Sequence, residues 1–233
     1  MCVTEAMTTQ ELPMIIEQLT VGPIQENCYI VGDEETREGF IVDPGYEASR
    51  ILEVVKQLGL TITKIINTHA HVDHICAVQP LKDALAERPL LRRVPFYLHP
   101  EERMHLPELV EHAAMFGMLD VKAPTVDFDL ADGDVIECGP LSIEVTHTPG
   151  HTPGHCLLRV GDDVFCGDLI FAGSIGRVDL PGGDHEAMIE SLERHILTLA
   201  DAVRLHPGHG ESTTVALERQ YNPFLRGLRA YES

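Results

Sequence analysis

The chain has little positive charge and no long apolar run. Only 17 of its 233 residues are Lys or Arg, against 37 Asp or Glu, and the formal net charge is −20. A basic stripe that could follow a phosphate backbone is therefore missing, and we expect no nucleic-acid partner. No apolar stretch approaches the ~20 residues of a membrane span, so we expect no membrane partner either.

The sequence also lacks a cysteine framework and a basic N-terminal leader. Its six cysteines include no CxxC pair, which argues against a redox motif and a disulfide scaffold. Residues 1–13 contain two acids and no Lys or Arg, whereas a signal peptide begins with a basic segment. We therefore expect reduced thiols and a cytoplasmic protein, with a loose extension over residues 1–13 ahead of a single domain over 14–233.

Metal-binding side chains are concentrated in residues 69–74, which read His-Ala-His-Val-Asp-His. The apolar run over 62–67 predicts a short buried strand just before them, and open α/β sheets place their sites at the carboxyl ends of strands. On an extended segment alternate side chains share one side, so His69, His71 and Asp73 are expected to converge, with His74 beside them. Four such side chains in six residues favour a metal site over surface or core histidines.

Three later segments each present one more ligand type after a turn. Residues 147–155 repeat Thr-Pro-Gly-His, and the Pro and Gly residues predict a loop that offers His147, His151 and His155. Asp168 and His209 each follow a short apolar strand and a glycine. Spacing alone does not choose among the three loop histidines. Imidazole and carboxylate ligands suit borderline divalent cations such as zinc, with iron or manganese as alternatives.

These motifs, in this order, resemble the metallo-β-lactamase superfamily and, within it, the glyoxalase II (hydroxyacylglutathione hydrolase) branch. Segments 14–17, 25–29, 41–45 and 167–177 resemble the same branch, so the resemblance extends over residues 14–225. It implies two divalent metal ions, zinc by analogy with the family, in two positions that share one bridging acid. The implied ligands are His69, His71 and His151 for the first ion, Asp73, His74 and His209 for the second, and Asp168 between both.

The resemblance also implies roles for neighbouring residues. A hydroxide formed between the two cations, held by Asp73 and Asp168, is the expected nucleophile. Asp43 is expected to orient a ligand histidine, with a plain Asp-Pro-Gly turn as its alternative, and His155 to lie just outside the ligands. Cys166 is interpreted as a buried strand thiol, not as the Cys ligand of a lactamase. The acid at Asp168 argues against β-lactam cleavage.

The expected fold is α/β, an αββα sandwich of two mixed β-sheets flanked by helices. Apolar periodicity predicts a helix over 47–58 that ends at Gly59, and a second helix that begins at Asp184 and continues to Leu199. The pattern over 135–145 predicts a β-hairpin. The irregular segment 87–128 is either a surface helical insertion or a lid beside the substrate pocket, and both interpretations stay open.

The expected function is hydrolysis of an acyl-thioester of the S-lactoylglutathione type, with a small anionic thioester as partner. Arg177 matches a basic position that holds glutathione in this branch, but Asp179 and Glu211 stand where the pattern has tyrosines. The stretch after His209 is too short for the helical domain of longer members. The alternatives are a mononuclear-iron persulfide dioxygenase, which the complete second ligand set disfavours, a lactonase, and a metal-free scaffold. The sequence does not indicate the oligomeric state.

Overall fold

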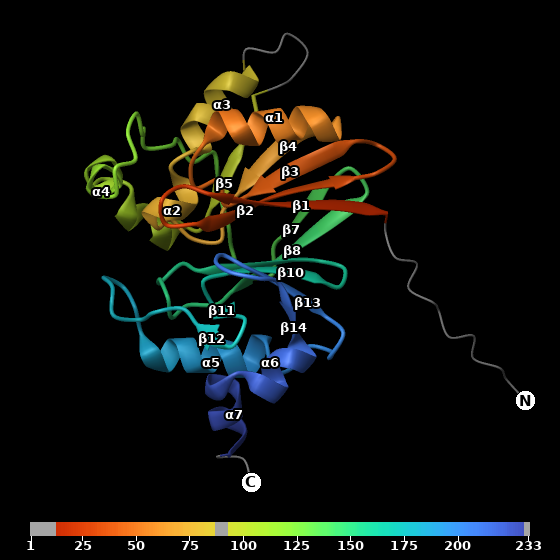
Figure 1. Cartoon of the computed structure of the whole chain (residues 1–233), viewed down its shortest axis with the longest axis vertical. Coiled ribbons are helices and arrows are strands. Elements are labelled where there is room, and N and C mark those ends of the chain that lie inside the picture. The colour runs from red at the N-terminus through yellow and green to blue at the C-terminus, as the bar shows by residue number, and fades with distance from the viewer. Residues whose placement is uncertain (1–12, 87–92, 231–233) are drawn as a thin grey trace, which may run out of the picture.

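Two six-stranded sheets lie face to face between outer layers of helices (Figure 1). The computed structural model describes residues 13–86 and 93–230, so all but the last residue of the expected N-terminal extension lies outside the described residues. The αββα arrangement confirms the predicted fold class. None of the described helices has both the length and the hydropathy needed to cross a bilayer.

The first sheet is formed by the N-terminal half of the chain. Its strands follow chain order, with antiparallel pairing up to β3 and parallel pairing after it. They are β1 (Met14–Val21), β2 (Glu26–Asp33), β3 (Glu38–Val42), β4 (Thr61–Ile66), β5 (Phe96–Leu98) and β6 (Phe128–Asp129). The helical elements of this half are α1 (Ala48–Leu58), α2 (Val72–Ile75), α3 (Val78–Ala86), the 3-10 helix η1 (Pro100–His105) and α4 (Leu109–Met115).

The second sheet is formed by the C-terminal half, in the order β14-β13-β10-β9-β8-β7. Its strands are β7 (Val135–Cys138), β8 (Leu141–His147), β9 (Cys156–Val160), β10 (Asp163–Gly167), β13 (Arg204–Pro207) and β14 (Thr213–Thr214). A small hairpin joins β11 (Ile170–Phe171) to β12 (Ser174–Ile175). The outer face is covered by α5 (His185–His195), α6 (Val215–Tyr221) and α7 (Pro223–Ala230) (Figure 1).

Strand β2 shows how the layers are held together. All of its residues are buried, and their side chains alternate between two cores. Cys28 and Ile30 pack in the core that contains residues of α1 and α3, whereas Tyr29 and Val31 pack against the second sheet. Each buried side chain of this size contributes about 1.5–3 kcal/mol. The strand therefore packs the first sheet against its helical layer on one face and against the second sheet on the other.

The predicted helix boundaries and hairpin are confirmed where the sequence carries strong local signals. Helix α1 ends at Gly59, whose φ of 67° is a left-handed conformation that glycine adopts without strain. At the start of α5, the Asp184 carboxylate accepts a 3.0 Å hydrogen bond from the backbone N–H of Ala187. This helix ends at His195, however, before the predicted Leu199. Strands β7 and β8 form the expected hairpin.

The irregular segment 87–128 contains more regular structure than either interpretation assumed. It carries β5, η1 and α4, and β6 begins at its last residue, Phe128. Strands β5 and β6 extend the first sheet, so part of the segment belongs to the central layers. These strands have three and two residues, too short to give an alternating pattern. A lid movement of the segment stays a prediction.

A buried carboxylate joins the two strands that lead to Asp168 and His209. Asp163, at the start of β10, accepts two 2.6 Å hydrogen bonds from Arg204 and lies 2.8 Å from His206 Nε2. Burial alone would raise the pKa of Asp163, but the bonds from Arg204 and His206 outweigh it and lower this pKa to about 2. Asp163 therefore stabilises the fold above its unfolded pKa of about 4, and this contribution is lost as the pH falls toward 2.

We expect Asp163→Asn to remove that pH dependence. The variant should be less stable than the wild type at pH 7 by roughly 1–2 kcal/mol, and the difference should shrink between pH 4 and 2. Urea unfolding followed at several pH values measures both free energies. A difference that stays constant over this range would contradict the assignment of the low pKa to Asp163.

Candidate metal centre

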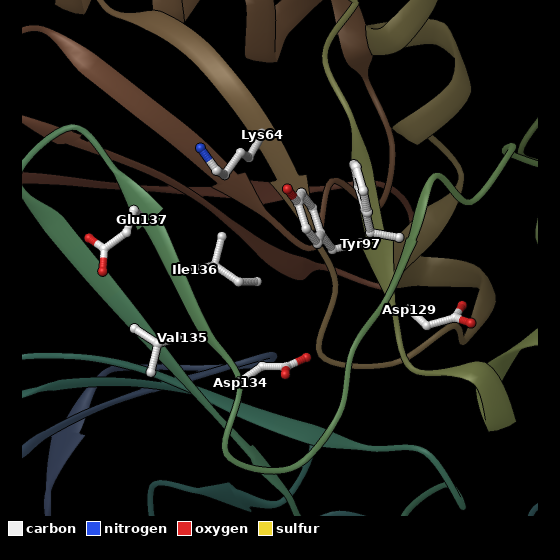
Figure 2. Close-up of a pocket in the computed structure, with 8 residues that line it drawn as sticks. Lys64, Tyr97, Asp129, Asp134, Val135, Ile136 and Glu137 are labelled. Atoms are coloured by element: carbon white, nitrogen blue, oxygen red, sulfur yellow. The ribbon is translucent and has the colours of Figure 1, made fainter.

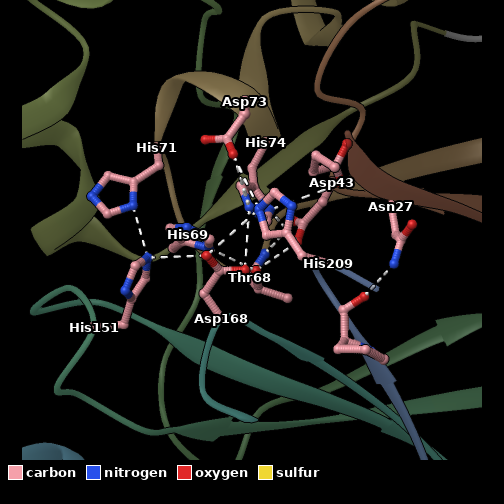
Figure 3. Close-up of polar contacts among 12 residues, drawn as sticks. Asn27, Asp43, Thr68, His69, His71, Asp73, His74, His151, Asp168 and His209 are labelled. Atoms are coloured by element: carbon pink, nitrogen blue, oxygen red, sulfur yellow. Dashed lines mark hydrogen bonds and ion pairs between the residues drawn. The ribbon is translucent and has the colours of Figure 1, made fainter. Parts of the chain in front are cut away.

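The predicted metal ligands converge at one edge of the two sheets (Figure 3). His69 and His71 lie in the connection from β4 to α2, Asp73 and His74 lie in α2 itself, and the loop between β8 and β9 carries His151. Asp168 directly follows β10, and His209 follows β13. Because β10 and β13 are parallel neighbours, their carboxyl ends place these two residues side by side. Segments from both halves of the chain thus form the cluster.

The cluster consists of two groups of three. The ligand atoms of His69, His71 and His151 lie within 4.8 Å of one another, and so do those of a second group, Asp73, His74 and His209. The prediction that Asp73 converges with His69 and His71 on an extended segment is wrong. The chain turns into helix α2 directly after His71, so Asp73 and His74 lie on a helical turn that faces the second group.

Asp168 lies between the two groups. Its Oδ1 is 3.4 Å from His74 Nε2, and its Oδ2 is 3.4 Å from His151 Nε2. The same Oδ2 lies 3.8 Å from His209 Nε2. One carboxylate thus approaches histidines of both groups, which is the placement that a bridging ligand requires.

Four of the histidines are oriented by hydrogen bonds from Nδ1 that leave Nε2 facing the interior of the cluster. The oxygen acceptors are Thr68 Oγ1 at 3.0 Å from His69, Asp43 Oδ2 at 3.1 Å from His74, Arg177 O at 2.7 Å from His151 and Gln25 O at 3.2 Å from His209. In His71 it is Nδ1 that faces the interior, 2.8 Å from His151 Nε2. An acceptor at one ring nitrogen fixes the tautomer and leaves the other lone pair for a cation.

Three buried atoms of the cluster make no hydrogen bond among the described residues: His69 Nε2, His74 Nε2 and Asp168 Oδ1, of which the last two face each other as an ion pair at 3.4 Å. Leaving a buried polar atom without a partner costs about 1–3 kcal/mol. Cations bound between the two groups would coordinate all three atoms. The donor set of imidazoles and carboxylates, together with these atoms, fits a pair of divalent metal ions.

The protonation states also favour cation binding. Burial, reinforced by neighbouring histidines, lowers the pKa of His69 well below its usual value and that of His71 to about 3, so both rings stay neutral. For His74, burial lowers the pKa, but Asp168 and Asp73 outweigh it and raise it well above the usual value. Burial raises the pKa of Asp168, but His74 outweighs it and the net pKa is low. A cation would therefore replace the proton on His74.

Asp43 and His155 both contact residues of the cluster. Asp43 Oδ1 accepts a 2.7 Å bond from the Thr68 backbone N–H, and its Oδ2 accepts a 2.6 Å bond from the Thr68 hydroxyl in addition to facing His74. His155 is buried, and its Nε2 accepts a 3.2 Å bond from the backbone N–H of Asp168. Asp43 thus contacts His74 directly and His69 through Thr68, while His155 holds the backbone of the central acid.

Two contacts of the cluster were not predicted. Thr68 links Asp43 to His69, and its only sequence signal is its position directly before a ligand histidine. Glu26 is fully buried with Oε1 3.9 Å from His74 Nδ1, and burial raises its pKa well above the usual value. Because Glu26 lies far from residues 69–74 in the sequence, no local pattern indicates this contact.

Two residues that could compete as ligands point elsewhere. His147 Nε2 donates a 2.7 Å bond to Pro153 O, and the ring stacks on His99 with centroids 4.4 Å apart. Cys166 is completely buried in the core between the second sheet and its helices, and its thiol donates to Ile170 O at 3.5 Å. The prediction of a buried strand thiol at position 166 is confirmed.

Arg177 lies next to the cluster, since its carbonyl oxygen is the acceptor for His151. Its guanidinium forms a bidentate pair with Asp179, with bonds of 2.7 and 2.8 Å. Both side chains are exposed, at 61% and 69%, so water screens the pair and an anionic ligand can compete for it. The basic group predicted to hold the substrate is thus already partnered by an acid.

A cavity of about 390 Å³ lies apart from the histidine cluster. It is found where the first sheet meets strand β7, and Figure 2 shows Lys64 and Tyr97 on one side of it and Glu137 on the other. Its lining includes one basic residue and three acids, and none of the seven predicted ligands. The metal chemistry is therefore separate from this cavity.

The fold and the cluster define an αββα protein with a metal centre at the common edge of its sheets. The family model described as the metallo-beta-lactamase superfamily matches residues 21–209, and the chain belongs to this superfamily of metallo-hydrolases. Hydroxyacylglutathione hydrolase GloC of Haemophilus influenzae is 35% identical over 91% of this chain and 98% of its own length. The mitochondrial persulfide dioxygenase ETHE1 of Bos taurus is 30% identical over 91% of this chain and 76% of its own length.

Solved structures show the same relationship. The structure of BLEG-1 B3 metallo-beta-lactamase has a TM-score of 0.81 and 36% identity, and the match covers 91% of this chain and 99% of that one. TTHA1623, in a di-iron-bound form, has a TM-score of 0.78 and 39% identity, over 90% of this chain and 100% of that one. The chain is therefore a metal-binding hydrolase of this superfamily, with relatives that differ in named activity.

Proposed function

We propose that the protein is a dinuclear metal-dependent hydrolase that cleaves an acyl-thioester of the hydroxyacylglutathione type. The observation that carries the proposal is the arrangement of two groups of three ligands with Asp168 between them. The similarity to hydroxyacylglutathione hydrolase GloC supports the thioester class. The five cysteines of the described residues are free and buried, which supports a reducing, cytoplasmic compartment.

The ligand residues differ in their exposure to solvent, and we assign their roles accordingly. His69 and His74 are fully buried and would hold the ions from the interior. His71, Asp73 and His209 are partly exposed, so the substrate would approach on their side. When bound, zinc, iron or manganese ions would lower the pKa of a water molecule and polarise the acyl carbonyl.

Two further rings lie beside the exposed ligands, where the substrate would enter. The ring of Phe171 lies 5.9 Å from that of His209, and the ring of His105 lies 5.2 Å from that of His71. These side chains would flank the acyl group while Asp168 and Asp73 keep their charge toward the ions. Cys166 would not serve as a side-chain nucleophile, because it is buried on the far side of its strand.

A panel of substrates tests the reaction class. The proposal predicts that the metal-loaded protein cleaves S-lactoylglutathione and simple acyl-thioesters faster than lactones and β-lactams, and that it does not consume oxygen with glutathione persulfide. β-Lactams belong in the panel because BLEG-1 is named a metallo-beta-lactamase, and the persulfide because of ETHE1. Oxygen uptake without thioester cleavage would favour the dioxygenase, and preferential lactone or β-lactam cleavage would refute the thioester class.

Charge at the Arg177–Asp179 pair is expected to tune the KM for anionic thioesters. Asp179→Asn frees the guanidinium, so the KM for S-lactoylglutathione should fall, whereas Arg177→Ala should raise it. Each change should be about two- to fivefold, the size of an exposed ion pair, with kcat nearly constant because the contact is remote from the reacting bond. Steady-state kinetics at low and high salt measure both. An uncharged thioester is the control and should show no change; equal changes for both substrates would contradict this role.

A further inference from the structure

Glu102 is a buried carboxylate that joins the two loops of the first ligand group. It lies on η1 and is completely buried. Its Oε2 accepts a 2.7 Å hydrogen bond from the backbone N–H of Ala70, and its Oε1 accepts a 2.8 Å bond from that of Gly154. Ala70 stands between His69 and His71, and Gly154 stands between His151 and His155.

The two N–H groups belong to different halves of the molecule. Ala70 follows β4 of the first sheet, whereas Gly154 lies in the loop between β8 and β9 of the second sheet. Glu102 therefore spans the interface at which the first metal position is assembled. The approach is close, since a Cβ on Gly154 would lie 3.0 Å from Glu102 Oε1 and 2.6 Å from His99 Nδ1.

The energetics favour a specific task for this side chain. A buried carboxylate is costly unless hydrogen bonds compensate it, and Glu102 has both oxygens bonded at the short distances of charge-assisted bonds. The nearest histidine nitrogen, His105 Nε2, is 3.9 Å away, so the two amides are its main partners. The two oxygens of Glu102 match the two N–H donors, whereas the amide of a glutamine would offer only one acceptor oxygen.

We propose that Glu102 is a positioning residue that sets the separation between the His69–His71 loop and His151, and thereby the metal affinity of the first position. The inference rests on the proposed dinuclear function. It also gives η1, in the middle of segment 87–128, the role of holding the two ligand loops, because a displacement of η1 would break the hydrogen bonds from Ala70 and Gly154 to Glu102.

Glu102→Gln tests the proposal, because the amide side chain has one acceptor oxygen for two N–H donors. Competitive titration of the metal-free protein with zinc and a chromophoric chelator should show one binding step weakened by about 10–100-fold, as for other partners that orient ligands, and a second step unchanged. The kcat of the zinc-loaded variant should fall more than its KM rises. Glu101→Gln, an exposed neighbour on the same 3-10 helix (side chain 57% exposed), is the matched control and should titrate like the wild type.

If both zinc-binding steps of Glu102→Gln have the affinities of the wild type, the proposal is overturned. If the variant does not fold, amide hydrogen exchange of the metal-free wild type decides. Slow exchange at Ala70 and Gly154 supports the two hydrogen bonds to Glu102 on which the proposal depends, and fast exchange at both overturns it. A wild-type chain that binds only one ion contradicts the proposed dinuclear function instead, and Glu102 is then judged on the exchange rates alone.

Discussion

Asp168→Ala is expected to remove both metal ions and to reduce turnover by more than about 100-fold. Its carboxylate approaches His74 and His209 of one group and His151 of the other. Without it, each cation would have one ligand fewer and less negative charge beside it. Loss of a partner that only orients a ligand costs 10–100-fold, and a shared ligand should cost more. Elemental analysis after gel filtration, with thioester turnover, measures both effects.

Cys166→Ala is the matched control, two residues away on the same strand end. The thiol lies in the apolar cluster that also contains Leu169 and Met188, and its hydrogen bond goes to Ile170 O and not to a ligand of either group. We expect unchanged metal content and turnover within a few-fold, with some loss of stability from the smaller side chain. Loss of a metal ion from Cys166→Ala, or full metal content in Asp168→Ala, would show that the ligand assignment is wrong.

The second large effect is expected at Gly208, which precedes His209. A Cβ at this position would lie 2.3 Å from Asp168 Oδ1 and 2.6 Å from His74 Cε1, closer than any unstrained contact. Gly208→Ala must therefore displace the central carboxylate or the histidine, and overpacking of this kind costs about 1–3 kcal/mol. Turnover should fall at least tenfold and the second group should lose metal affinity, both measurable on the zinc-reconstituted variant.

Gly227→Ala provides the comparison for Gly208→Ala. Gly227 lies in α7 with open space around its Cβ position, and alanine favours a helix by up to about 1 kcal/mol over glycine. The thermal midpoint of this variant should stay equal or rise, and its metal content should not change. Wild-type metal content in Gly208→Ala would contradict the close approach of the turn to Asp168.

Local signals in the sequence predicted the elements whose ends are marked by helix-capping or turn residues. Gly59, Asp184 and the Gly139-Pro140 turn each set a boundary through contacts within a few residues, so these boundaries are readable without the fold. Strands β5 and β6 were not predicted, because so few residues show no periodicity and their place is set by pairing with β4.

The sequence identified the residues of the cluster but not all of its geometry. Histidines and acids after strands are visible as motifs, and resemblance to a family sorted them into two sets. The helical turn that separates Asp73 from His71 was missed because the four-residue helix α2 has no pattern of its own. Glu102 was missed because its partners Ala70 and Gly154 are far away in the sequence and offer backbone N–H groups, which carry no sequence signature.

The metal content of the wild-type protein tests the central claim most directly. The protein should be purified without added chelator, reconstituted with zinc and, separately, with iron or manganese, and freed of excess metal before elemental analysis. The account predicts close to two ions per chain for the metal that supports thioester cleavage, and loss of both from Asp168→Ala. A single iron per chain under all loading conditions, with the second group empty, would contradict it.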